Sequence, residues 1–205
     1  MTLDKTILRE LAVSIDVTGY LRIMDAAHRA TPTGMGYGKT RFASPTDSFK
    51  LLYVAQDLQT ALAEAVIRDR FQGKQKRELL EEDIEQSVIT SMVSLAQLKL
   101  LDLRTSGANR LGVPTNAVRG RAQQSGRRFS QELYDSTDFD GIVYMSRITN
   151  AECVAIYDRA VDSKLDPACP IVDLVRLAAL EPALRSLNVS LVKLHPMFLR
   201  AGPLK

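Results

Sequence analysis

Short apolar runs, each bounded by polar or turn-forming residues, recur along the chain and predict β-strands. The clearest is 51–55, a continuous apolar run typical of a buried strand. The runs 142–145 and 152–157 are separated by a turn at Asn150 and Ala151, which predicts a hairpin. Further strands are predicted at 19–24, 88–95, 98–103 and 189–194.

Apolar residues at helical spacing predict the helices. The best defined begins at Asp57, a suitable N-cap, and runs to about Phe71 before Gly73 ends it. Other helices are predicted at 4–14, at 74–87 as a charged and solvated segment, from Pro114 onward, around 129–134, and at 171–188 with an interruption at Pro182. These helices do not alternate regularly with the strands, which favours an α+β fold over a doubly wound parallel sheet.

Length and charge narrow the class of protein. The chain has 205 residues, enough for one domain with its own core. Its 27 basic and 24 acidic residues give a net charge of +3, too small to indicate nucleic acid as a direct partner. No apolar run reaches the roughly 18 residues that a membrane helix needs. We expect a cytoplasmic protein with no membrane partner.

The cysteines and histidines are few. Cys153 and Cys169 cannot build a disulfide framework and do not have the spacing of a Cys-x-x-Cys motif. His28 and His195 lie far apart in the sequence, so we expect no metal site.

The stretch 34–68 combines features that suit an anionic ligand. It contains a glycine-rich loop ending in Arg41 and Phe42, then the apolar strand with Tyr53, then the helix with Glu64. Glycines at every second position of the loop suit a close approach to the backbone. Glu64 has an alternative interpretation, because with Arg68 it forms an ordinary i,i+4 surface pair.

A second basic segment lies at 102–128. It contains six arginines and one acid, Asp102. Both a basic helix surface and a rim that attracts anions fit this composition. Its arginines are Arg104, Arg110, Arg119, Arg121, Arg127 and Arg128.

Common catalytic motifs are missing from the sequence. There is no P-loop and no Rossmann fingerprint, since the 34–39 glycine run follows no strand and lacks the spacing. There is also no Gly-x-Ser-x-Gly and no His-Glu-x-x-His.

The order of the polar residues resembles that of a known family. Arg22 on an early strand is followed by Arg41-Phe42, Tyr53, Glu64 in Ala-Leu-Ala-Glu-Ala, and Ser146-Arg147 at the end of Asp-Gly-Ile-Val-Tyr-Met-Ser-Arg. Over about residues 20–160 this pattern resembles the RES domain, the toxin of bacterial Xre–RES toxin–antitoxin pairs. One departure is the loop sequence Gly-Lys-Thr-Arg-Phe, where the family often has Gly-Gly-Arg and where Lys39 adds a charge.

The resemblance implies an ADP-ribosyltransferase-like fold, a split mixed sheet flanked by helices around an NAD cleft. It implies a single domain with an N-terminal helical extension at 1–18, the RES-like NAD-binding part at 19–162, and a C-terminal helix and strand packed on it at 163–205.

The resemblance also implies the roles of the site residues. Glu64 would bind the ribose of NAD and stabilise the oxocarbenium-like transition state, and no metal or prosthetic group is required. Arg22 and Arg41 would hold the phosphates, with Arg147 nearby. Tyr53 would stack on the nicotinamide and Ser146 would hydrogen-bond the substrate, while inorganic phosphate is a candidate co-substrate.

Three functions follow as hypotheses. The first is a toxin that cleaves the nicotinamide–ribose bond of NAD by phosphorolysis or hydrolysis and is neutralised by an Xre-type antitoxin. The second is an ADP-ribosyltransferase that modifies a protein. The third is a non-enzymatic module that binds through the basic residues 104–128. Whether the chain forms a homo-oligomer stays open.

Overall fold

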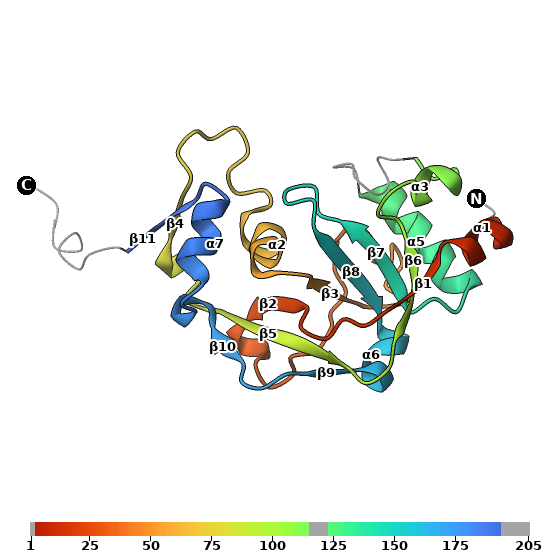
Figure 1. Ribbon diagram of the computed structural model, residues 1–205, viewed down its shortest axis with the longest axis horizontal. Coiled ribbons are helices and arrows are strands. Elements are labelled where there is room, and N and C mark those ends of the chain that lie inside the picture. Colours follow the sequence, from red (N-terminus) through yellow and green to blue (C-terminus); the bar gives the residue numbers. More distant parts are fainter. Residues whose placement is uncertain (1–2, 115–122, 194–205) are drawn as a thin grey trace, which may run out of the picture.

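A large mixed β-sheet forms the centre of the protein (Figure 1). The computed structural model describes residues 3–114 and 123–193. The main sheet contains β1 (Ala12–Ile15), β2 (Leu21–Asp25), β3 (Leu51–Ala55), β5 (Ser87–Ser94), β6 (Leu98–Asp102), β7 (Gly141–Met145), β8 (Glu152–Tyr157), β9 (Leu165–Pro167) and β10 (Val172–Asp173). Their order is β1-β6-β7-β8-β3-β2-β5-β10, and β9 also pairs with β5. Of the main-sheet pairs, β6 and β7 run parallel and the others antiparallel.

Helices pack against both faces of this sheet, and further helices lie at one end of it (Figure 1). The small second sheet pairs β4 (Glu78–Leu80) with β11 (Ser190–Val192) in parallel. The described α-helices are α1 (Lys5–Glu10), α2 (Leu58–Leu62), α3 (Gly107–Arg110), α5 (Gln124–Ser136), α6 (Asp158–Lys164) and α7 (Leu180–Ser186). A π-helical turn η2 (Ala63–Ile67) continues α2, and 3₁₀ turns are η1 (Ala26–His28), η3 (Glu81–Asp83) and η4 (Leu174–Arg176).

The sheet opens between β2 and β3. These strands share a single register pair, Leu21 with Ala55, whereas β3 pairs with β8 along its whole length. Beyond that pair β2 follows β5 instead, which leaves a gap in the middle of the sheet. The expected α+β fold with a split mixed sheet in one domain is therefore confirmed.

Strand β3 shows how the sequence builds the core. Leu51 and Ala55 face the apolar cluster that includes α5, while Leu52 and Val54 face the cluster that includes α6. The alternation follows the two-residue period of a strand, and both faces are buried because helices cover both. A third cluster packs α2 and α7 together at the far end.

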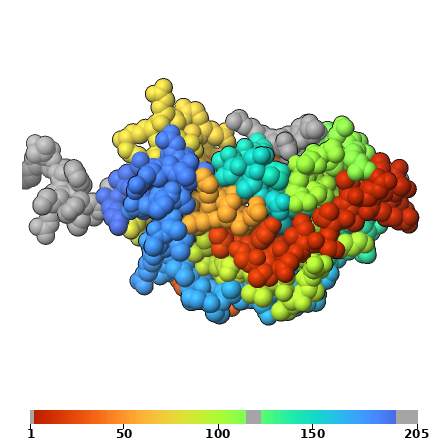
Figure 2. Space-filling view, viewed as in Figure 1, coloured from red at the N-terminus to blue at the C-terminus, as the bar shows by residue number. Residues whose placement is uncertain are grey.

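The N-terminal prediction was partly wrong. A helix was expected over 4–14, but α1 ends at Glu10 and the next residues form β1, which pairs with β6. Val13 and Ile15 are β-branched and half-buried, so the open edge of β6 favours a strand there. Figure 2 shows this N-terminal segment (red) lying across the body of the protein.

Two further helix predictions need correction. The segment 74–87 forms β4 and a 3₁₀ turn, because Leu79 is fully buried in the pairing with β11, a partner more than a hundred residues away. In the segment 171–188 only α7 is α-helical, and Pro182 lies in its first turn, where no N–H bond is lost. The helix predicted from Pro114 falls mainly on 115–122, outside the described residues.

Within the described residues, no helix has the length and apolar character needed to cross a membrane.

Candidate functional site

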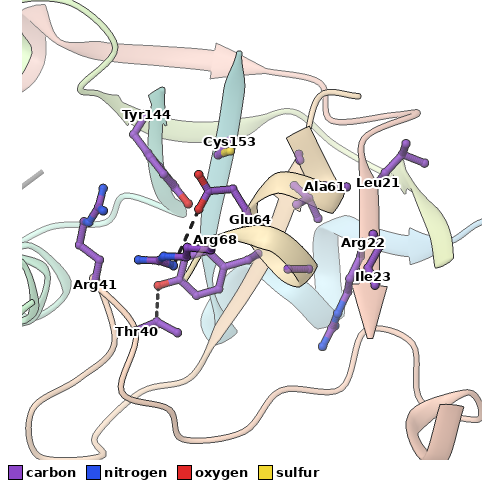
Figure 3. A pocket seen from close by; sticks show the side chains of 14 residues that line it. Leu21, Arg22, Ile23, Thr40, Arg41, Ala61, Glu64, Arg68, Tyr144 and Cys153 are labelled. Carbon is purple, nitrogen blue, oxygen red and sulfur yellow. Dashed lines mark hydrogen bonds and ion pairs between the residues drawn. The ribbon is translucent and has the colours of Figure 1, made fainter. Parts of the chain in front are cut away.

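A cavity of about 180 Å³ lies at the gap between β2 and β3 (Figure 3). The strands supply two of its walls and the α2–η2 helix supplies another. It is lined by Leu21, Arg22, Ile23, Thr40, Arg41, Tyr53, Val54, Ala55, Ala61, Glu64, Ala65, Arg68, Tyr144 and Cys153. The opening of the sheet therefore creates the site, because a fully paired β2–β3 ladder would leave no room there.

Glu64 reaches the cavity from the π-helical turn. The Asp57 side chain starts α2 by accepting a hydrogen bond from the Thr60 amide at 2.7 Å. At Ala63 the helix widens into η2, a type of turn that is frequent at functional sites. The i,i+4 pair with Arg68 exists, but its atoms are 3.8 Å apart, the outer limit for an ion pair.

Ser146 makes the closest contact with this acid. Its hydroxyl donates a hydrogen bond to Glu64 Oε1 at 2.7 Å, across 82 residues of sequence. The Ser146 Oγ also accepts hydrogen bonds from the amides of Ile148 at 3.2 Å and Thr149 at 3.4 Å. Ser146 is 2% exposed. The turn between β7 and β8 therefore holds Ser146 in place, and Ser146 in turn orients the carboxylate.

Tyr53 joins the glycine-rich loop to the sheet. Its hydroxyl lies 2.7 Å from the Thr40 hydroxyl and accepts from the Phe42 amide at 3.4 Å. Burial raises the pKa of Tyr53 to about 12, so the phenol is neutral at physiological pH. This anchoring fixes the position of the neighbouring Arg41.

Arg41 supplies a buried positive charge beside the acid. It is 6% exposed, and Figure 3 shows it on the same side of the cavity as Arg68 and Glu64. Burial lowers its pKa most, and the nearby cations Arg68 and Arg147 lower it further, against opposing effects of Tyr144 and Glu64. An arginine keeps its charge under such conditions, so this side of the cavity favours an anion.

Arg22 and Arg147 are placed differently from Arg41. Arg22 lines the cavity but donates to the carbonyl oxygens of Pro32 at 2.8 Å and Gly34 at 2.7 Å. It thus holds the glycine-rich loop, and burial lowers its pKa. Arg147 is exposed and does not line the cavity. Phosphate binding by either residue stays a prediction.

Several lining residues were missed from the sequence, notably Thr40, Tyr144 and Cys153. Tyr144 could have been found, because it lies two residues before Ser146 and so shares its face of the strand. It pairs with Cys153 across β7 and β8. Burial, and next the charge of Glu64, raise the pKa of Cys153 to about 12, which leaves the thiol neutral and poorly nucleophilic.

Among the described residues, no group of three or more histidines, cysteines or acids is arranged to hold a metal ion.

The fold and site define an α+β protein whose split sheet holds an acid, a serine and arginines around one cavity. Residues 19–177 match the family model described as the RES domain. The chain therefore belongs to the RES domain family.

The chain is similar to a curated protein and to a solved structure. One, described as "Probable toxin y4kH" from Sinorhizobium fredii (strain NBRC 101917 / NGR234), is 36% identical over 78 residues, 37% of this chain. That match spans 61% of the relative's own length. The other is a chain of the crystal structure of the M. tuberculosis MbcT–MbcA toxin–antitoxin complex, at 16% identity and a TM-score of 0.63. The structural match covers 84% of this chain and 93% of the solved chain, and it shows that the two share a fold.

Proposed function

We propose that the chain is the toxin of a toxin–antitoxin pair and that it consumes NAD by breaking the nicotinamide–ribose bond. Membership of the RES family supports the proposal, as do a relative described as a probable toxin and a similar fold from a toxin–antitoxin complex. The observation that carries it is the 2.7 Å hydrogen bond between Ser146 and Glu64 beside the buried Arg41. This arrangement offers one oriented carboxylate and one fixed cation in a single cavity.

Glu64 would stabilise the charge that develops on the ribose. Nicotinamide in NAD is cationic, so when the C–N bond breaks its electrons go to the ring nitrogen and nicotinamide leaves neutral, without a general acid. The ribose carbon becomes oxocarbenium-like. Ser146 binds Oε1 and Arg68 lies 3.8 Å from Oε2, so the remaining lone pairs of the carboxylate would face this positive charge or the ribose hydroxyls.

A nucleophile then attacks the same carbon. With water, its oxygen bonds to the ribose and a proton is released, giving ADP-ribose. With inorganic phosphate, a phosphate oxygen bonds instead, giving ADP-ribose 1″-phosphate. Glu64 would orient either nucleophile.

The remaining residues would bind and position the substrate. Arg41 would hydrogen-bond a phosphate or attract the anionic part of the substrate. Tyr53 would form an uncharged wall of the pocket for the nicotinamide. Arg22 would act through the loop that it holds, with any direct phosphate contact using its other N–H groups. Arg147, at the rim, would attract the substrate.

An antitoxin of the Xre type would restrain this activity. An unrestrained NAD-consuming enzyme would exhaust the NAD of its host. A partner that covers the cavity would prevent this by blocking access of NAD. Co-expression with a candidate Xre-type antitoxin, followed by co-purification, tests the pair.

Incubating purified protein with NAD, with and without phosphate, and quantifying nicotinamide by chromatography tests the reaction. We expect nicotinamide release, and the ribose product distinguishes hydrolysis from phosphorolysis. Glu64→Gln should abolish release while its melting temperature stays near wild type. Glu85→Gln, the same change at an exposed acid, is the matched control. Absence of release under both conditions would contradict the proposal, and labelled protein bands from radioactive NAD would favour the transferase alternative.

The non-enzymatic alternative loses support from the basic segment. Arg104 pairs with Asp102 and Glu152, and Arg110 pairs with Glu10. Arg127 donates to backbone carbonyls of 43–44. Arg119 and Arg121 lie outside the described residues. Three of the four described arginines are thus engaged within the protein, while Arg128 is exposed.

A further inference from the structure

A second cavity, of about 240 Å³, adjoins the candidate site and shares one residue with it. The shared residue is Arg68, whose guanidinium lies 3.8 Å from Glu64 Oε2. The second cavity is formed by the end of the π-helical turn and the segment after it, together with Ile148 from the turn that follows Ser146. Arg68 therefore lies between Glu64, which lines the first cavity, and the second cavity.

This second cavity is basic. Arg68, Lys74 and Arg77 all line it, and no acidic side chain is among its described lining residues. Three nearby acids have partners within the described part of the chain. Asp69 accepts a hydrogen bond at 2.7 Å from Gln72, which lines the cavity. Asp83 pairs with Arg70 at 2.6 Å, and Glu78 pairs with Lys76 at 2.8 Å.

Arg77 is held ready to donate. Its guanidinium lies over the Phe71 ring at 5.6 Å, which restricts the side chain. Its Nε is buried and has no hydrogen-bond acceptor among the described residues. Arg77 as a whole is half-buried and lines the cavity, so its terminal guanidinium nitrogens are the donors that a ligand would meet.

The first cavity is smaller than a typical ligand pocket. Ligand pockets usually measure roughly 300–1,000 Å³, and neither cavity reaches that range alone, whereas the two together do. In NAD the diphosphate begins one ribose ring away from the C–N bond. A ribose next to Glu64 would therefore place its phosphates next to Arg68.

We propose that the cavity of Arg68, Lys74 and Arg77 binds a phosphate group, with Arg68 linking it to the acid of the first cavity. The proposal rests on the proposed function only in taking the ligand to be phosphate-bearing. Phosphate binding is then assigned to Lys74 and Arg77, which follow the helix. Arg22 instead donates hydrogen bonds to carbonyl oxygens of the glycine-rich loop. The phosphate could belong to the substrate or be free inorganic phosphate, and these sources are separable.

Isothermal titration with ADP-ribose, inorganic phosphate and adenosine tests this without any turnover. Arg77→Gln and Lys74→Gln should each weaken ADP-ribose binding about tenfold, because each removes a charge-assisted contact. Lys76→Gln is the matched control, with the same charge change on a side chain that is 80% exposed and paired outside the cavity. Adenosine, which has no phosphate, should bind equally to all four proteins or to none. Melting temperatures establish that the variants fold, and Lys74 is exposed, so its variant keeps the test usable if Arg77→Gln unfolds.

The outcomes separate this proposal from the proposed function. A loss for ADP-ribose assigns the cavity to the substrate's own diphosphate, and the same loss for inorganic phosphate alone assigns it to free phosphate. The proposal is overturned if the wild type binds neither probe, if losses stay below twofold, or if Lys76→Gln loses as much. Nicotinamide release, measured separately, decides the proposed function, so either can fail while the other stands.

Discussion

The hydroxyl of Ser146 should control the rate of the reaction through Glu64. Ser146→Ala removes the donor to Oε1, and it leaves the carboxylate attached to η2 without its closest contact. A hydrogen bond to a charged group contributes about 1.5–3 kcal/mol. If the carboxylate must be oriented only in the transition state, that loss lowers kcat by about 10- to 150-fold.

Nicotinamide release over a range of NAD concentrations measures this effect. We expect kcat to fall while KM changes little, because Ser146 positions the acid and does not hold the substrate alone. Ser130→Ala is the control, since Ser130 is also fully buried and its hydroxyl lies 2.9 Å from that of Tyr157, away from the cavity. It should reduce stability without reducing kcat.

The reasoning is refuted if Ser146→Ala keeps kcat within twofold of wild type. It is also refuted if Ser130→Ala lowers kcat as much, since the effect would then be general to loss of a buried hydroxyl.

Three further predictions concern the rest of the fold. Gly73→Ala should lower the free energy of unfolding by about 1 kcal/mol, because φ is +71° there; Gly36→Ala, without a left-handed φ, should not, and urea unfolding checks both. Iodoacetamide at pH 8 should label only Cys169 of the native protein, because Cys153 is buried with a pKa of about 12; mass spectrometry showing two labels would contradict this. The pKa of Tyr53 is near 10 in the unfolded chain and about 12 in the folded protein, so the folded state keeps its proton to higher pH. The free energy of unfolding should therefore fall between pH 10 and 12, by up to about 1.4 kcal/mol per pH unit. An unchanged slope of stability against pH in Tyr53→Phe would contradict this.

Local signals in the sequence were enough to predict much of the fold. Strands such as β3 and β8 are continuous apolar runs, and Asp57 marks the start of the helix that follows β3. The predicted end of that helix near Phe71 was wrong, because η2 already ends at Ile67. Where the type of element was predicted wrongly, a distant partner decided the structure. The segment around Leu79 has helical composition, but pairing with β11 makes it a strand.

The candidate site was predictable for a different reason. Periodicity treated Glu64 as a surface residue paired with Arg68, and only the order of Arg41, Tyr53 and Ser146 along the chain indicated otherwise. Their contacts depend on the opening between β2 and β3 and on the widened helical turn. The pattern of apolar residues predicts neither the opening nor the widened turn, because both arise from backbone geometry.

The π-helical turn makes the site sensitive to the number of residues as well as to their identity. In η2 each amide bonds one residue further back than in an α-helix, so the turn contains one residue more. Deleting one residue between Glu64 and Arg68 would restore regular helix and reduce their spacing from four residues to three. The relative direction of Glu64 and Arg68 would then change, although the shortened sequence would still suit a helix. Deletions in this segment should therefore impair the site as replacement of Glu64 does.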